Sequence, residues 1–124
     1  MLCDTCVLIE YLRGNNKARS LLTKNSKANL AMSAVTWMEL MVGAFNKQEI
    51  AVIRKAFAKF TIIEINKQIS GLARELIEKF SKSHNLLIPD ALIAATAIIE
   101  KMPLLTYNVS DFRFIPGLVL GDEE

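Results

Sequence analysis

Residues that could build a disulfide framework or a zinc site are scarce in this chain. It has two cysteines, three positions apart, and one histidine. A small disulfide-stabilised protein needs several cysteine pairs, and a structural zinc site needs four cysteine or histidine ligands. The histidine, His84, lies in a polar stretch, and we expect it to be solvated rather than a ligand or base. The core and the chemistry must therefore come from other residues.

Long apolar runs and the common phosphate or ester motifs are also missing. No apolar run approaches the roughly 18 residues of a membrane span, and the first residues do not form a basic segment followed by an apolar one. The sequence has neither a G-x-x-x-x-G-K-[ST] loop nor a G-x-S-x-G elbow. We therefore expect a soluble, cytoplasmic protein with no membrane partner.

What the chain does have is enough apolar sequence for one core. It contains 124 residues, of which 52% are hydrophobic and 23% are charged, so we expect residues 1–124 to form a single globular domain. Its mean hydropathy of +0.27 predicts that a partner chain covers part of the surface. The formal net charge of +2 neither requires nor excludes a nucleic-acid partner.

Short apolar runs alternate with segments of helical periodicity. Strands are predicted over 1–3, 28–32, 60–65 and 103–107, with a short edge strand over 117–120. Helices are predicted over 7–12, 17–23, 34–45, 48–58, 68–84 and 89–100, and 121–124 as a frayed tail. Ser33 is expected to cap the third helix. Strands separated by helices predict a central parallel sheet flanked on both faces, a three-layer α/β/α fold.

Several polar residues stand where parallel sheets usually bind ligands, just beyond the carboxyl ends of strands. Asp4 directly follows the first predicted strand, and Asn108 and Asp111 follow the fourth. Asp90 stands at the start of the last predicted helix. Each acid also has a purely structural alternative, because Asp4 and Asp90 can cap helices and Asp111 can stabilise a turn. Their positions alone leave both interpretations open.

Glu39 is harder to explain as a surface residue. Its helical neighbours three and four positions away are Val35, Thr36, Val42 and Gly43, so it shares a face with small and apolar side chains. A carboxylate there is costly to desolvate unless it has a partner, most simply a cation. No lysine or arginine lies within one turn, which favours a metal ion. Ligands that are all oxygen select Mg²⁺ or Mn²⁺.

The stretch Cys3-Asp4-Thr5-Cys6 invites a different interpretation, as a redox or metal-binding C-x-x-C pair. A redox pair needs an exposed cysteine at a helix N-terminus, whereas Cys3 lies inside the first predicted strand, where a small buried residue is expected. A zinc site needs two further soft ligands that the chain does not offer. The important residue of this stretch is therefore predicted to be Asp4.

Four segments occur in the order and spacing of the PIN-domain nucleases, and the chain most closely resembles their small VapC-type toxins. The segments are LCDTCVLIEYLRG, SAVTWMELMVGA, LLIPDALIAATAIIE and LLTYNVSDFRFIPGLVL. The resemblance runs from Leu2 to Leu120. One such segment would be weak support, but four in this order are specific.

The resemblance implies a PIN-like fold and an acidic metal site formed by Asp4, Glu39, Asp90 and Asp111. It also implies supporting contacts near the metal from four side chains: Thr5, Cys6, Thr106 and Asn108. Family members differ in whether the position of Asn108 or of Asp111 carries the fourth acid, and we favour Asp111. Cys6 departs from the family, which usually has Asn or Ser at this position. A thiol is a weaker hydrogen-bond donor than either, so the contacts near the metal are expected to differ in detail.

The implied activity is Mg²⁺- or Mn²⁺-dependent hydrolysis of RNA phosphodiesters. A cognate VapB-type antitoxin is expected to cover the acidic groove, and the apolar excess fits a homodimer as well. The metal site does not itself separate RNA from DNA, so substrate choice must come from groove shape and basic residues. The candidates are Arg13, Lys17, Arg19 and Arg113, although a solvated surface charge is the favoured interpretation of each.

Two other classes of protein remain alternatives. A catalytically idle PIN-like module would bind only proteins, and a titration with Mg²⁺ would separate it from the enzyme. A receiver-like phosphoacceptor also uses acids to bind Mg²⁺. That class needs paired acids after the first strand and a lysine on a late one, and this sequence has neither.

Overall fold

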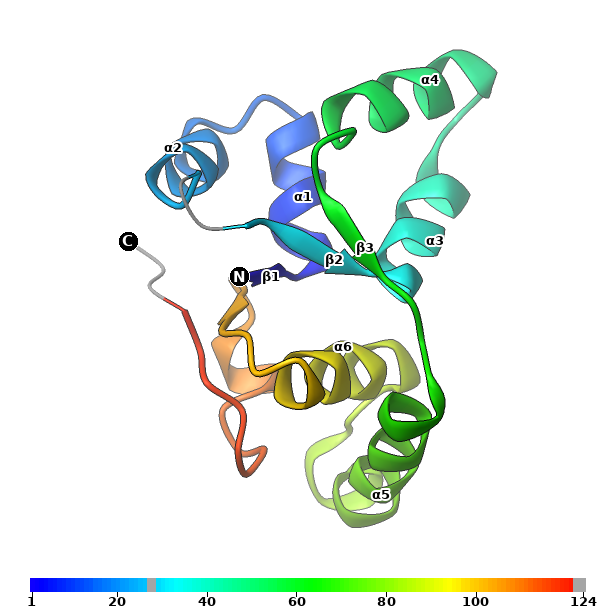
Figure 1. Cartoon of the computed structure of the whole chain (residues 1–124), viewed down its shortest axis with the longest axis vertical. Helices are drawn as coiled ribbons and strands as arrows, with labels where there is room; N and C mark the ends of the chain where they lie inside the picture. The colour runs from blue at the N-terminus through cyan, green and yellow to red at the C-terminus, as the bar shows by residue number, and fades with distance from the viewer. Residues whose placement is uncertain (27–28, 122–124) are drawn as a thin grey trace.

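The chain forms one parallel sheet with helices on both of its faces (Figure 1). The computed structural model describes residues 1–26 and 29–121. The strands are β1 (Leu2–Cys3), β2 (Ala31–Ser33), β3 (Thr61–Ile63) and β4 (Leu104–Leu105). The helices are α1 (Thr5–Leu12), α2 (Asn16–Lys24), α3 (Ala34–Gly43), α4 (Lys47–Ala56), α5 (Lys67–His84) and α6 (Ile88–Ile99), followed by the 3₁₀ helix η1 (Val109–Asp111).

The strand order is β3-β2-β1-β4, and neighbouring strands run parallel. Leu2 pairs with Ala31 on one side and with Leu104 on the other. The chain moves outward from β1 to β3 and then returns past β1 to add β4. β1 and β4 therefore border the point where the winding reverses, and open α/β sheets bind ligands beyond the strand ends at such a point.

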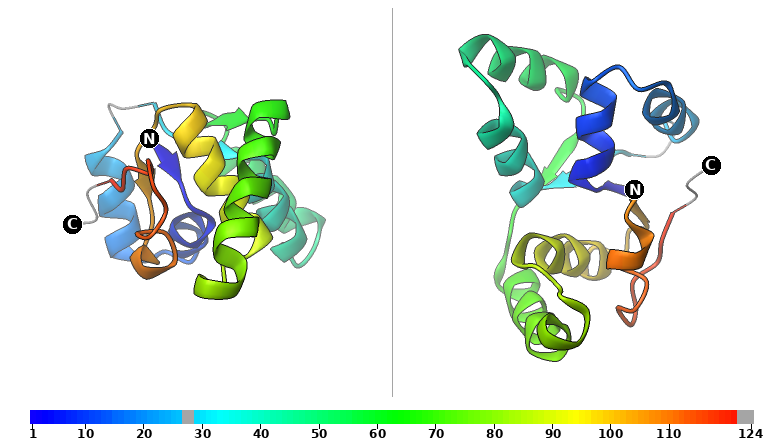
Figure 2. Two further views of the ribbon diagram at one scale, coloured as in Figure 1. Left: turned by 90° about the horizontal axis from the view of Figure 1, so that it is seen from below. Right: turned by 180° about the vertical axis from the view of Figure 1, so that it is seen from behind.

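The helices form two separate layers, with α1 to α4 on one side of the sheet and α6 and α5 on the other (Figures 1 and 2). The alternation of strand side chains explains this division. Cys3 and Leu105 belong to the buried cluster under α1 to α4, whereas Leu2 and Leu104 belong to the cluster under α6. The predicted three-layer fold is confirmed.

Small side chains place α6 between the sheet and α5. Ala91, Ala94 and Ala95 are completely buried, so the helix can approach its neighbours closely on more than one side. α5 packs outside it and has a single buried stripe that includes Ile69 and Leu76. No helix in the described part of the chain is long and apolar enough to cross a membrane.

The predicted edge strand over 117–120 is the main error of the sequence analysis. This segment makes one isolated bridge, between Leu104 and Leu120, and no strand. The first helix begins at Thr5, two residues before the predicted start, because Asp4 caps it. Ser33 caps α3 as predicted. Residue 28 and the tail residues 122–124 lie outside the described residues.

Candidate metal centre

Asp4 is the first residue after β1 and lies where the winding of the sheet reverses. Its Oδ1 accepts a hydrogen bond from the backbone N–H of Thr5 at 2.8 Å, so Asp4 is the N-cap of α1. Its Oδ2 accepts from the Thr106 hydroxyl at 2.7 Å and from the Cys6 thiol at 3.2 Å. The residue is only 4% exposed. The capping alternative is therefore correct, and the same carboxylate stands at the predicted ligand edge.

α3 brings Glu39 to the same edge through a contact with α1. The Thr5 hydroxyl donates to Glu39 Oε1 at 2.7 Å and lies 3.0 Å from the hydroxyl of Thr36, which is fully buried. One partner of Glu39 is therefore a neutral hydroxyl, which the sequence analysis did not foresee, and the metal ion expected from the sequence stays a prediction. Glu39 is only half-buried, so its carboxylate keeps contact with water and does not require a charged partner.

Asp90 lies in the first turn of α6 and is half-buried. Burial, followed by repulsion from Asp4, Asp111 and Glu39, raises the pKa of Asp90 from 3.8 to about 6. The N-cap of α6 is Leu87, so Asp90 is not the capping residue that the structural alternative proposed. Because three of these causes are other carboxylates, the negative charges of four acids act on one edge of the sheet.

The turn after β4 carries the last two predicted polar residues. The backbone N–H of Asn108 donates to the Thr106 hydroxyl at 2.9 Å, and the N–H of Asp111 donates to the Asn108 carbonyl at 3.0 Å. Both side chains are exposed. The charge of Asp111 is one of the causes that raise the pKa of Asp90.

Neither cysteine is part of a redox pair. Both are free, and Cys3 is completely buried in β1, as predicted. Burial raises the pKa of Cys3 to about 12, and burial with repulsion from Asp4 raises the pKa of Cys6 to about 11. Both thiols are therefore protonated at neutral pH. Cys6 takes the role of a hydrogen-bond donor to Asp4, at the position where the resemblance implied Asn or Ser.

The donors at this edge fit a hard divalent ion. They are carboxylate oxygens, and every influence that raises the pKa of Asp90 is burial or another acid, so the local negative charge is concentrated. Among the described residues, no group of three acidic, cysteine or histidine side chains lies close enough together to hold a metal ion. Any ion at this edge would therefore need water ligands in addition to the carboxylates.

A groove of about 530 Å³ lies between α1, α3 and α4, and Glu39 is the one candidate acid that lines it. Most of its lining is apolar, including Ile9, Leu40 and Val52, and Glu39 lies in its wall. Sequence reasoning missed this groove and the Thr36 contact. The signal for Thr36 was its position three residues before Glu39, on the same helix face. His84 is exposed as expected, but its ring stacks on Phe114 with centroids 4.2 Å apart.

The chain is an α/β protein in which a four-stranded parallel sheet carries acidic side chains near the point where its winding reverses. Residues 1–116 match the PIN domain, and the chain belongs to that family. It is 32% identical to Ribonuclease VapC19 of Mycobacterium tuberculosis, with 94% of this chain and 95% of the relative covered. This membership removes the receiver-like alternative.

Two solved structures have the same fold. A toxin–antitoxin complex from Klebsiella pneumoniae contains a chain that is 36% identical, with a TM-score of 0.79 and coverage of 95% of this chain and 94% of that one. VapBC2 from Rickettsia felis, bound to a DNA fragment from its promoter, matches with a TM-score of 0.83 at 23% identity, covering 97% and 96%.

Proposed function

We propose that this chain is a metal-dependent endoribonuclease and the toxin of a toxin–antitoxin pair. The observation that carries the proposal is the gathering of four carboxylates at one sheet edge, in a chain of the PIN family. Asp4 follows β1 and Glu39 lies on α3. Asp90 lies in the first turn of α6, and Asp111 is the last residue of η1. The relatives support the same function, because one is named a ribonuclease and another is the toxin–antitoxin complex.

We assign the metal ligands to Asp4, Glu39, Asp90 and Asp111, with Mg²⁺ or Mn²⁺ as the ion. Held by these carboxylates, a divalent ion would supply a water of lowered pKa and would offset the charge of the phosphate. The contribution of the protein is to hold the carboxylates in place. The supporting contacts come from four side chains: Thr5, Cys6, Thr106 and Asn108.

Basic residues around the acidic edge are the candidates for binding RNA. Lys17 Nζ lies 5.3 Å from the centre of the Tyr107 ring, next to the turn that follows β4. The Arg13 guanidinium is paired with Glu10 at 2.9 Å, and Arg113 is exposed. Lys17, beside the turn that leads to Asp111, and Arg113, two residues after it, are therefore our candidates for contact with phosphate.

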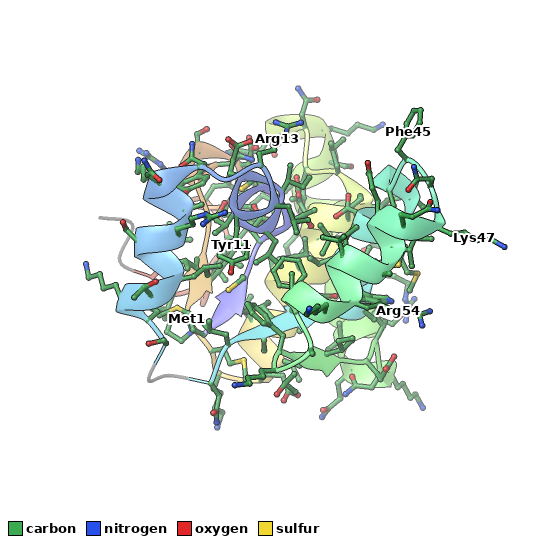
Figure 3. All side chains as sticks on the ribbon, turned by 90° about the horizontal axis from the view of Figure 1, so that it is seen from above. Met1, Tyr11, Arg13, Phe45, Lys47 and Arg54 are labelled. Atoms are coloured by element: carbon green, nitrogen blue, oxygen red, sulfur yellow. The ribbon has the colours of Figure 1, made fainter. Side chains whose placement is uncertain are left out.

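Exposed apolar side chains support the expected protein partners, a VapB-type antitoxin and a second copy of the chain. Val42 is 85% exposed and Phe45 is 87% exposed, and Figure 3 shows Phe45 pointing away from the body of the molecule. Leu87 and Ile88, at the start of α6, are also exposed. Side chains of this kind usually become covered in an assembly. Light scattering at micromolar concentration tests the homodimer, and a monomer contradicts it.

The activity is tested with purified protein freed of its antitoxin. We expect it to cut members of a broad RNA panel with Mg²⁺ or Mn²⁺, and not with EDTA. Asp4→Asn and Asp90→Asn should reduce the cleavage rate by about 100-fold or more, because each removes a charge that holds the metal. Glu78→Gln, an exposed acid on α5, is the matched control and should cleave normally.

An intact RNA panel, or equal cleavage by wild-type and Asp4→Asn proteins, would contradict the proposal. Calorimetric titration with Mg²⁺ then tests the alternative, an idle PIN-like module that binds only proteins and no Mg²⁺.

A further inference from the structure

The hydroxyl of Thr106 joins Asp4 to the turn that carries Asp111. It lies one residue beyond β4 and is completely buried. The register Cys3↔Leu105, with the Asp4 N–H donating to the Leu105 carbonyl at 2.9 Å, sets Asp4 beside Thr106. Residues 102 positions apart in the sequence are thereby placed side by side.

The direction of each hydrogen bond at Thr106 is fixed by chemistry. The carboxylate of Asp4 can only accept, so the one hydroxyl proton of Thr106 is donated to Asp4 Oδ2 at 2.7 Å. The backbone N–H of Asn108 can only donate, and it donates to Thr106 Oγ1 at 2.9 Å. The result is a chain from the Asn108 N–H through Thr106 to Asp4, in which each bond polarises the next.

The neighbouring Cys6 cannot replace this link. Its thiol reaches Asp4 Oδ2 at 3.2 Å and lies 3.7 Å from Thr106 Oγ1, and its sulfur accepts a backbone hydrogen bond from Tyr107. Sulfur is a weak donor and a weak acceptor, so these contacts are weaker than those of the Thr106 hydroxyl. Asp4 therefore has one strong side-chain donor, Thr106, and the turn that leads through Asn108 to Asp111 is tied to the site by the same atom.

We propose that Thr106 is a positioning residue that couples the orientation of the Asp4 carboxylate to that of the Asn108–Asp111 turn. The inference rests on the proposed function only in that the coupled acids are assigned to bind metal. Removal of the hydroxyl leaves the part-buried Asn108 N–H without its acceptor and leaves Asp4 Oδ2 with only the thiol as a side-chain donor. The carboxylates of Asp4 and Asp111 are then no longer held in a fixed orientation relative to each other, although neither residue has been substituted.

The test compares Thr106→Val, Thr106→Ser and Thr96→Val with the wild-type protein, all without the antitoxin. Thr106→Val keeps the shape and removes the hydroxyl, whereas Thr106→Ser keeps the hydroxyl. Thr96→Val is the matched control, because Thr96 is also completely buried and its hydroxyl donates only to the Leu92 carbonyl within α6. Two quantities are measured: hydrogen exchange of the Asn108 amide in metal-free protein, and the affinity for Mn²⁺ by calorimetry.

We expect Thr106→Val to lose protection of the Asn108 amide and to bind Mn²⁺ about 10- to 100-fold more weakly, as is usual when a group that orients a metal ligand is removed. Thr106→Ser should restore both, and Thr96→Val should change neither. Unchanged protection and Mn²⁺ affinity in Thr106→Val would overturn the coupling, as would equal losses in Thr96→Val. If the wild-type protein binds no Mn²⁺, the proposed function fails, while the amide exchange still decides whether Thr106 holds the turn.

Discussion

At the residue scale, Asp90 and Asp4 differ in what surrounds their carboxylates. Asp4 accepts three hydrogen bonds, from Thr5, Cys6 and Thr106. The Asp90 side chain accepts no hydrogen bond from any of the described residues. Burial and the other acids raise its pKa to about 6. The ionised form of Asp90 therefore destabilises the folded, metal-free protein.

This difference predicts that Asp90→Asn stabilises the metal-free protein at neutral pH. The folded protein holds the proton of Asp90 more tightly than the unfolded chain, so wild-type stability falls as the pH rises from about 4 through 6. The gain should reach about 1 kcal/mol at pH 7.5 after allowance for solvent screening. Urea unfolding in EDTA measures it.

The stability difference between Asp90→Asn and the wild-type protein should depend on pH in one direction only. The advantage of Asp90→Asn should shrink towards zero as the pH falls to about 4, where the wild-type carboxyl is neutral in the folded protein. Glu78→Gln is the control for removal of an exposed acid. A gain that is the same at pH 4 and 7.5 would show that charge repulsion is not its cause.

The cysteines give a second prediction at this scale. With pKa values raised to about 12 for Cys3 and about 11 for Cys6, almost no thiolate is present at pH 7.5. A disulfide reagent such as DTNB should therefore react with the native protein far more slowly than with protein unfolded in urea, which should release two thiols per chain. Rapid reaction of one thiol in the native protein would contradict this, and Cys6→Ser would identify it.

At the scale of elements, the site depends on how α1 and α3 are joined. Thr5 is the first residue of α1, and its hydroxyl contacts both Thr36 and Glu39 of α3. Thr5→Val removes the only hydrogen bond found for the Glu39 side chain among the described residues. We expect a loss of about 1–2 kcal/mol in the free energy of unfolding and a fall of about tenfold or more in RNA cleavage.

Thr5→Ser separates the two effects of that change, because serine keeps the hydroxyl. It should retain cleavage, even if the loss of the methyl group slightly lowers stability. Urea unfolding and initial cleavage rates are measured on the same preparations. Cleavage by Thr5→Val at the wild-type rate would show that Glu39 does not need the link to α1.

Sequence patterns predicted the order of most elements, because their signals are local. The amphipathic period of α5 and the capping residue Ser33 of α3 are examples. The strand predicted over 117–120 was wrong, because β-propensity does not reveal how many residues can pair with a neighbouring strand. Only the Leu104–Leu120 bridge forms there.

The candidate site was predictable in part, because its acids follow strands or begin a helix. Their hydrogen bonds were not, since Asp4 and Thr106 meet only through the register of β1 with β4. The Thr5 contact of Glu39 was missed for a similar reason. A search for cations within one turn does not consider a hydroxyl on another helix.

At the scale of the whole molecule, the apolar groove between α1, α3 and α4 adjoins the candidate site at Glu39. Val52 is 60% exposed in its wall, and Glu39 lies in the same wall. We predict that Val52→Lys weakens inhibition by the cognate antitoxin about tenfold or more, because a lysine would have to be desolvated on binding. RNA cleavage is titrated with antitoxin to measure this.

Val52→Ala is the control for the groove, since it changes the shape of the wall without adding charge. Without antitoxin, both variants should cleave RNA at the wild-type rate. Equal inhibition of Val52→Lys and wild-type protein would place the antitoxin elsewhere on the surface.

The pairing of the first strand with the last has a consequence for when the activity can arise. Asp4 is synthesised 102 residues before Thr106, from which it accepts a hydrogen bond, and Asp111 follows later still. During synthesis the growing chain carries Asp4, Glu39 and Asp90 before the strand that completes their surroundings. The order of the residues therefore delays assembly of the acidic edge until β4 and the turn after it have been made and have joined the sheet.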